Sequence, residues 1–387
     1  MMVTPTFFNN KNSNNNNTIF GYSLLVFLFI NLLNSCSGQS IFTRPGLVDQ
    51  DDFGVSHLVM YEGLKMHIRT YDNPNITSGH TILFDAGLPF FSSSWGSVLL
   101  NLIPKMTDLN IKTVILYDRY GYGYSDLSPY GIDSFDFVRR LKASLNILDY
   151  QPPYILTGWS WGGINIQSYY VSYPEDVVGL YSVDGTDKEF YNDPVWINGM
   201  SGIVTSFKTY IKNNTENHQE FYKNCLEGRV PANHGFYVDS TNLPKIALTN
   251  NQNIFSDPSN KYLNAATQEL GIMFQSSFKL LQIIDGLQKK EQFPFKNTPI
   301  VVLTASVNGQ PWMDRQSAVA QLSTKSLHFI DTVSSHHIPT DNPVKVVNGL
   351  VELIKMIDTV EPLNSSSVSL APNSLILILV AIFVFFI

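Results

Sequence analysis

This sequence has few cysteines and no excess of positive charge. Its 387 residues include two cysteines, Cys36 and Cys225, which are too few for a disulfide framework. Lys and Arg together number 25 against 32 Asp and Glu, a formal net charge of −7 that leaves no basic footprint for nucleic acid or anionic lipid. We therefore expect no nucleic-acid partner.

Repeats and ligand-binding signatures are missing as well. No internal repeat is visible, and low complexity is limited to an Asn-rich stretch near the N-terminus. The eight histidines lack metal-ligand spacing, and Gly121-Tyr122-Gly123 lacks the rest of a dinucleotide-binding fingerprint. Because 44% of the residues are hydrophobic, the chain can bury a substantial core. We predict a globular protein without a metal or a cofactor.

The apolar run near the N-terminus, residues 19–33, is too short for a comfortable membrane span, which needs about 20 residues. Small residues follow it up to Gly38, where a signal peptidase would cut. This layout predicts a signal peptide over residues 1–37. Cys36 leaves a bacterial lipoprotein signal as the alternative.

The C-terminal apolar run, residues 375–387, is also short and has no charge behind it. A polar spacer precedes the run, and small residues precede the spacer, which is the layout of a glycolipid-anchor (GPI) attachment signal over residues 364–387. A tail-anchor helix is the alternative. The expected attachment sites are Asn364, Ser365 and Ser366.

The two terminal signals together predict a protein on the extracellular face of the cell membrane, reached through the secretory pathway and held there by a lipid anchor. N-glycosylation sequons begin at Asn75 and at Asn213, and the secretory route could use both. Sequons are common by chance, so they support this location only weakly.

Short apolar runs, rich in β-branched or aromatic residues, alternate with segments of helical spacing. Alternation over residues 55–69 predicts an opening hairpin, and helical spacing predicts helices over 135–148, 164–173 and 344–357. The β-α-β-α order predicts an α/β fold with a mostly parallel sheet flanked by helices. The expected buried strands are 81–84, 113–117, 154–157, 179–183 and 300–304, and a last strand is expected near 327–330.

The stretch over residues 186–297 interrupts this alternation, because it is long, polar and helix-prone without strand runs. A structureless loop of that length is implausible in a compact domain, so we expect an inserted helical cap over one end of the sheet. Its apolar side chains, Phe255, Met273, Phe274 and Phe278, would suit either a hydrophobic acyl group or the core of the cap. The expected domains are core residues 38–184, cap residues 185–297 and core residues 298–363.

The sharpest motif is Gly158-Trp159-Ser160-Trp161-Gly162, which follows a strand run and precedes a helical pattern. That context is typical of a nucleophile elbow. Gly158 and Gly162 meet its steric need, because a strained strand-to-helix turn leaves no room for side chains beside the serine. The turn would place Ser160 at a helix N-terminus, whose dipole favours the negative charge that develops in acyl transfer.

Together with this elbow, segments 117–126 and 174–184 make the chain similar to the α/β-hydrolase fold family over residues 55–357. In that family the strand before the first helix usually ends in His-Gly, and here the pair is Ala86-Gly87. The resemblance implies that the backbone N–H groups of Leu88 and Trp161 form the oxyanion hole.

The same resemblance suggests that Asp118 and Arg119 form a scaffold pair outside the chemistry. Asp85 lies beside the expected site and has no role that the sequence assigns.

A serine needs a histidine to remove its proton, and the triad order on this fold is serine, acid, histidine. The segment from His336 to Pro343 is similar to the family's histidine segment, so His336 is the expected base. We expect its neighbour His337 to point away.

The acid is the open member of the expected triad. The family commonly places it after the strand before the last one, but here that strand leads to Asn308 without a carboxylate until Asp314. Some members place the acid one strand earlier, where this chain has Asp184, which would orient the imidazole. Asp184 is therefore the expected acid, with Asp187 and Asp314 as alternatives.

These residues predict a serine hydrolase that cleaves a small-molecule or lipid-like carboxylic ester, a thioester or an amide through an acyl-enzyme. A serine nucleophile argues against the epoxide and haloalkane branches of this fold, which need a carboxylate there. Two alternatives stay open: a non-catalytic cell-surface binding or adhesion module, and an acyltransferase with the same triad.

Overall fold

The computed structural model describes residues 54–194 and 259–359, together with positions 197, 198, 202, 204, 205, 208, 209, 244, 247, 251, 254 and 257 between them. The predicted signal peptide, the sequon at Asn213 and the anchor residues Asn364, Ser365 and Ser366 lie outside the described residues. Asn75 is described, and it is exposed in the turn that precedes β3. No described helix is long and apolar enough to cross a membrane.

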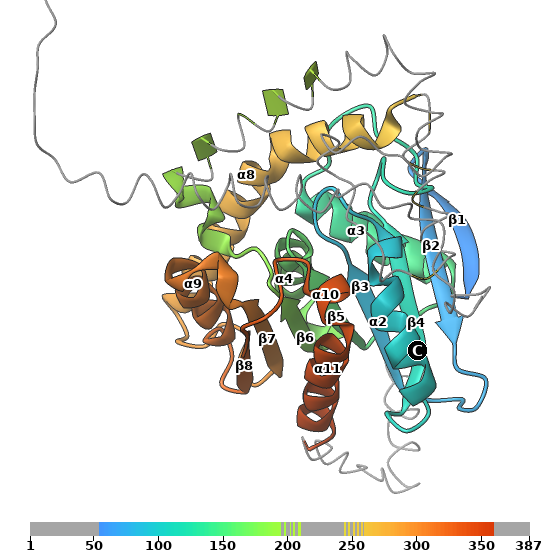
Figure 1. Ribbon diagram of the computed structural model, residues 1–387, viewed down its shortest axis with the longest axis vertical. Helices are drawn as coiled ribbons and strands as arrows, with labels where there is room; N and C mark the ends of the chain where they lie inside the picture. Colours follow the sequence, from blue (N-terminus) through green and yellow to red (C-terminus); the bar gives the residue numbers. More distant parts are fainter. Residues whose placement is uncertain are drawn as a thin grey trace, which may run out of the picture.

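An eight-stranded sheet forms the centre of the described structure (Figure 1). Its strands lie in the order β1-β2-β4-β3-β5-β6-β7-β8, and β1, β2 and β4 pair antiparallel, whereas every other neighbouring pair is parallel. The hairpin and the mostly parallel sheet predicted from the sequence are both present. The strands are β1 (Val55–Tyr61), β2 (Leu64–Asp72), β3 (His80–Asp85), β4 (Ile111–Asp118), β5 (Tyr154–Trp159), β6 (Val177–Val183), β7 (Ile300–Ala305) and β8 (Ser326–Asp331).

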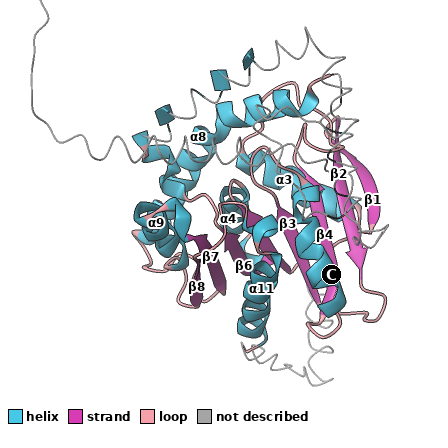
Figure 2. Ribbon diagram, in the orientation of Figure 1, coloured by secondary structure: helices cyan, strands magenta, loops and turns pink. Residues whose placement is uncertain are grey.

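Helices cover both faces of the sheet (Figure 2). Buried residues of α3, α4, α8 and α9 share one hydrophobic cluster with the sheet, and those of α2 and α11 share the other. Parallel strands covered on both faces are apolar along their length, which explains the uninterrupted apolar runs in the sequence. The helices are α2 (Gly96–Leu102), α3 (Ser134–Ile147), α4 (Gly162–Ser172), α8 (Lys261–Gln288), α9 (Gln310–Ala320), α10 (Ile338–Asp341) and α11 (Pro343–Asp358).

Helix α8 lies within the range predicted for the cap and crosses over the loop that follows β4 (Figure 1). Lys261 donates to the carbonyls of Gly123 and Ser125, both at 2.9 Å, and Gln268 donates to the carbonyl of Ser128 at 3.0 Å. The cap boundaries remain a prediction, because most positions from 195 to 258 lie outside the described residues.

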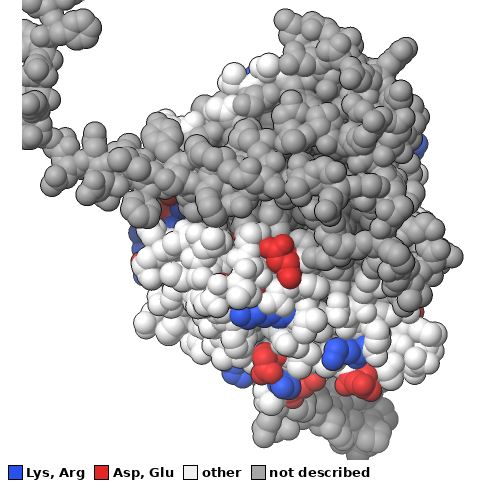
Figure 3. Space-filling model, in the orientation of Figure 1, with Lys and Arg blue, Asp and Glu red and all other residues white. Residues whose placement is uncertain are grey.

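Charged side chains of both signs are interspersed on the described surface seen in Figure 3. Opposite charges lie next to one another there, and no patch of one sign stands out on this face. This distribution agrees with the scattered Lys and Arg of the sequence.

Candidate active site

The chain turns sharply between β5 and α4, and Ser160 stands at that turn with a φ of 53°. A left-handed φ strains a non-glycine residue, and such strain is a property of the nucleophile elbow. A Cβ at Gly158 would come within 2.4 Å of the Gly162 carbonyl oxygen, and one at Gly162 within 2.5 Å of the Asp85 carbonyl oxygen. Both positions therefore need glycine because backbone approaches them closely.

The loop that follows β3 lies directly against the serine. A Cβ at Gly87 would sit 2.8 Å from the Cβ of Ser160 and 3.3 Å from its Oγ. Ser160 itself is half-buried, and its Oγ has no hydrogen-bond partner among the described residues. Bonds between a nucleophile and its base are frequently loose before a substrate binds.

His336 lies beside the elbow and bonds to Asp184. Its Nδ1 is 2.6 Å from Asp184 Oδ2, and its ring centroid is 5.8 Å from that of Trp159, the residue before the serine. Asp184 follows β6, one strand earlier than the usual position for the acid. A carboxylate that accepts from Nδ1–H leaves Nε2 free to take a proton.

Asp184 is fully buried and is held by three further donors. The backbone N–H of Ala305 donates to Oδ1 at 3.0 Å, the Trp312 indole donates to Oδ1 at 2.7 Å, and the Asn308 amide donates to Oδ2 at 2.6 Å. These donors satisfy the buried carboxylate and fix its orientation toward His336.

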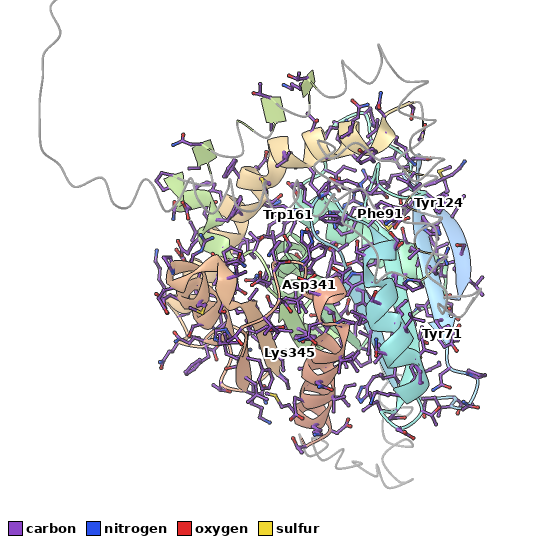
Figure 4. The ribbon with its side chains drawn as sticks, viewed as in Figure 1. Tyr71, Phe91, Tyr124, Trp161, Asp341 and Lys345 are labelled. Atoms are coloured by element: carbon purple, nitrogen blue, oxygen red, sulfur yellow. The ribbon has the colours of Figure 1, made fainter. Side chains whose placement is uncertain are left out.

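The loop that carries His336 is fixed from two sides. The Trp159 indole donates to the His336 carbonyl at 2.8 Å, which ties the loop to the elbow. On the other side, Asp341 Oδ2 accepts from the backbone N–H and the hydroxyl of Ser335, and Figure 4 shows Asp341 on α10. These contacts limit where the imidazole can move.

His337 packs differently from its neighbour. Its ring lies 5.4 Å from Phe90 and 5.3 Å from Trp159 between centroids, and it stands in the core rather than at Asp184. Burial, and then the adjacent His336, lower the pKa of His337 to about 3. This imidazole is therefore neutral at any pH near 7.

The two N–H groups expected to form an oxyanion hole are both free. Neither the Leu88 nor the Trp161 backbone N–H has a hydrogen-bond acceptor among the residues that the structure describes. Leu88 follows Gly87, whose loop touches Ser160, and Trp161 directly follows the serine, so both N–H groups belong to segments beside Ser160. Trp161 lies beneath α8 in Figure 4.

The alternative acids have other partners. Asp187 accepts from the Arg315 guanidinium at 2.7 Å and from the backbone N–H of Glu189. Asp314 is exposed and accepts from Gln310. Among the described residues, neither carboxylate bonds to His336.

The expected pairing of Asp118 with Arg119 is wrong. Asp118 accepts from His67 Nδ1 at 2.7 Å instead, and Arg119 donates to Asp85 at 2.7 Å and to Glu269 of α8 at 2.6 Å. The two side chains diverge because they follow one another at the end of a strand, where successive residues point to opposite faces.

A pocket opens beside Trp161, beneath α8. Both its aromatic and its polar side chains come from the β4–α3 loop, the first turns of α3 and α4, and α8. The residues that line it are Arg119, Tyr120, Ser128, Tyr130, Ile132, Ser134, Phe137, Trp161, Asn165, Ala265, Gln268 and Glu269.

A second relay of serine, histidine and aspartate occurs at the hairpin edge of the sheet. Ser56 Oγ lies 2.9 Å from His67 Nε2, and His67 Nδ1 lies 2.7 Å from Asp118. Ser56 is exposed within the paired strand β1 and lacks the positive φ of Ser160. This relay therefore lacks the turn that presents a nucleophile.

Sequence reasoning missed the residues that hold the site. Asn308 was noted as the place without a carboxylate, yet its amide bonds to Asp184. Trp312 carries no recognisable pattern, because it acts through a residue far away in the sequence. Arg119 belongs to segment 117–126, but the sequence predicts a pairing with Asp118 and gives no signal for its bonds to the loop after β3.

The model of the family described as "alpha/beta hydrolase fold" matches residues 87–339, more than half of the chain. The uncharacterized protein YqjL of Bacillus subtilis is 28% identical over 109 residues, which are 28% of this chain and 40% of YqjL. The chain thus matches less than half the length of that curated relative.

Solved structures share the fold at low sequence identity. A Pseudomonas aeruginosa protein, provisionally titled an epoxide hydrolase, matches with a TM-score of 0.56 at 16% identity, covering 82% of this chain and 99% of that one. Cfl2 of Burkholderia cenocepacia gives the same TM-score and identity over 77% and 95% of the two chains. With these folds and the family match, the chain belongs to the α/β-hydrolase fold family.

Proposed function

We propose that this protein is a serine hydrolase that cleaves a carboxylic ester, thioester or amide through an acyl-enzyme on Ser160. The observation that carries the proposal is the 2.6 Å bond from His336 to the buried Asp184, beside an elbow that holds a serine at positive φ. A histidine oriented by a buried carboxylate is what a serine hydroxyl needs to become a nucleophile.

The proposed reaction has two halves. Ser160 Oγ attacks the carbonyl carbon while His336 Nε2 takes the hydroxyl proton, and the leaving group then departs with that proton. Water, activated by His336 in the same way, attacks the acyl-enzyme, which releases the carboxylic acid product and returns the proton to Ser160. The N–H groups of Leu88 and Trp161 would hold the oxyanion in both halves.

The protein from Pseudomonas aeruginosa is titled an epoxide hydrolase, but that chemistry on this fold needs a carboxylate nucleophile. The elbow of this chain holds Ser160 instead, and a serine suits acyl transfer. The bond between Asp184 and His336 also argues against a non-catalytic binding module, because such a module has no need of a carboxylate that orients the histidine.

Labelling with a fluorophosphonate probe, which reacts with activated serines, tests this proposal. We expect the wild type to be labelled and to hydrolyse p-nitrophenyl esters, and Ser160→Ala to lose both properties. Ser56→Ala is the matched control, because Ser56 also bonds to a histidine that bonds to an aspartate. A folded wild-type protein that takes no label would favour the binding module.

A further inference from the structure

Arg119 is buried at the centre of the candidate site, with 4% of its surface exposed. All five of its N–H groups donate to acceptors on three different parts of the fold. They bond to Glu269 Oε1 at 2.6 Å and Oε2 at 3.0 Å, to Asp85 Oδ1 at 2.7 Å, to the Ala86 carbonyl at 2.5 Å and to the Gly87 carbonyl at 3.1 Å.

The bond to the Gly87 carbonyl has a geometric consequence for Leu88. The Gly87 carbonyl and the Leu88 N–H belong to one planar trans peptide unit, so they point in opposite directions. By holding the carbonyl, the guanidinium therefore fixes the direction of the N–H. This N–H has no acceptor among the described residues and lies in the loop that touches Ser160.

Asp85 ties the same loop to the helix behind the serine. Its Oδ1 accepts from Arg119, and its Oδ2 accepts from the Asn165 amide of α4 at 2.8 Å. Asp85 and Asn165 are both buried. The loop and the N-terminal turn of α4, which carry the two expected oxyanion donors, are thus joined by one carboxylate.

Glu269 brings α8 to this network. Its carboxylate accepts two bonds from Arg119 and a third from the Tyr122 hydroxyl at 2.9 Å. Burial alone would lower the pKa of Arg119, but the carboxylates of Glu269 and Asp85 raise it well above its usual value. The guanidinium therefore stays charged between α8 and the loop, and Arg119 and Glu269 both line the pocket beside Trp161.

We propose that Arg119 is a positioning residue that aims the Leu88 N–H at the oxyanion, and that Glu269 makes this aim depend on the position of α8. The inference rests on the proposed function, because it concerns the same serine site. It predicts that loss of the guanidinium weakens binding of the tetrahedral oxyanion more than binding of the substrate.

The experiment compares Arg119→Lys and Glu269→Gln with two matched controls, Arg140→Lys and Glu62→Gln. Arg140 is also 4% exposed and ion-paired, to Asp136 and Glu62, but it does not touch the loop of residues 86–88. For each variant we would measure kcat and KM for a p-nitrophenyl ester, the inhibition constant of the matching trifluoromethyl ketone, and the active fraction by fluorophosphonate titration. Thermal unfolding would report the folded state.

For Arg119→Lys we expect kcat per active site to fall about 10- to 100-fold, since loss of one oxyanion donor costs about 10²–10³ and the donor here is misaimed rather than removed. KM should stay within about twofold. The inhibition constant of the ketone should rise by the factor by which kcat/KM falls, because the adduct carries the oxyanion. For Glu269→Gln we expect the same proportional change in kcat/KM and in the ketone inhibition constant, but with only a severalfold fall in kcat.

Three results would overturn the inference: an unchanged ketone inhibition constant in Arg119→Lys, an equal loss in Arg140→Lys, or full activity in Glu269→Gln. If Arg119→Lys does not fold, Glu269→Gln carries the decision, because it keeps the guanidinium and the side-chain shape. A wild type without label or hydrolysis would contradict the proposed function itself, which separates the two failures.

Discussion

At the scale of single residues, the candidate triad shows what could be predicted from the sequence and what could not. Ser160 and His336 belong to local sequence motifs, so the motifs alone were enough to predict them. Asp184 was selected by its place after a strand, whereas its three structural donors come from 121 to 128 residues further along the chain. Contacts at such separations depend on the folded sheet, and a single sequence contains no local signal for them.

Asp184→Asn should lower kcat by about 10³–10⁴-fold, because an amide cannot hold the imidazole in the correct tautomer or stabilise its cation. In either orientation the NH2 group of the amide would face a donor, the Trp312 indole at the Oδ1 position or the Asn308 amide at the Oδ2 position, so we expect a lower midpoint of thermal unfolding. Ester hydrolysis and thermal denaturation measure the two effects. Asp314→Asn is the control and should leave both unchanged.

The reverse pattern, with full activity in Asp184→Asn and loss of activity in Asp314→Asn, would show that Asp314 is the acid.

At the scale of elements, the pattern of apolar runs predicted all six parallel-sheet strands, with ends within two residues of the observed bounds in most cases. Three described helices escaped prediction, of which α10 (Ile338–Asp341) is the shortest, with four residues. Helix α2 (Gly96–Leu102) has seven residues and is apolar on most of them, so its composition resembles that of a buried strand. Helix α9 includes Trp312, one of the donors to Asp184, and its N-cap is Gly309, which has no side chain to cap the helix.

The turn into α4 yields a second test, with Gly162→Ala and Gly271→Ala as a matched pair. A Cβ at Gly162 meets backbone at 2.5 Å, whereas one at Gly271 of α8 meets nothing within 4 Å. We expect Gly162→Ala to lose about 2 kcal/mol or more of stability together with most of its activity, because the elbow must shift. Gly271→Ala should gain about 0.5–1 kcal/mol from the lower entropy of the unfolded chain.

Urea unfolding gives the two free energies, and a Gly162→Ala variant as stable and active as the wild type would refute the close approach at the elbow.

At the scale of the whole molecule, a buried hydrogen bond joins β2 of the edge hairpin to the end of β4. Asp118 accepts from His67 of β2 and from the backbone N–H groups of Ser92 and Tyr124, both at 3.0 Å. Burial alone would raise the pKa of Asp118. These hydrogen bonds, of which the one from His67 has the largest effect, lower the pKa to about 2. One ionised carboxylate therefore holds together the three segments that carry His67, Ser92 and Tyr124.

The sign of the linkage follows from these pKa values. The folded pKa of about 2 lies below the unfolded value of 3.8, so Asp118 contributes stability that is present above pH 4 and is lost as the pH falls toward 2. Asp118→Asn should cost about 2 kcal/mol at pH 7, and the difference from the wild type should narrow between pH 4 and pH 2. Urea unfolding at several pH values checks this, and a constant difference would contradict it.

The shell around Asp184 also has a consequence for the order in which the protein is synthesised. Ser160 and Asp184, the proposed nucleophile and the proposed acid, belong to the first part of the chain, whereas their partners Ala305, Asn308, Trp312 and His336 leave the ribosome only after residues 185–297, the predicted cap. A growing chain that has reached residue 300 holds a carboxylate whose four partners do not yet exist. Burying that charge early would be costly, so β6 is expected to join its neighbours only when the last segment arrives.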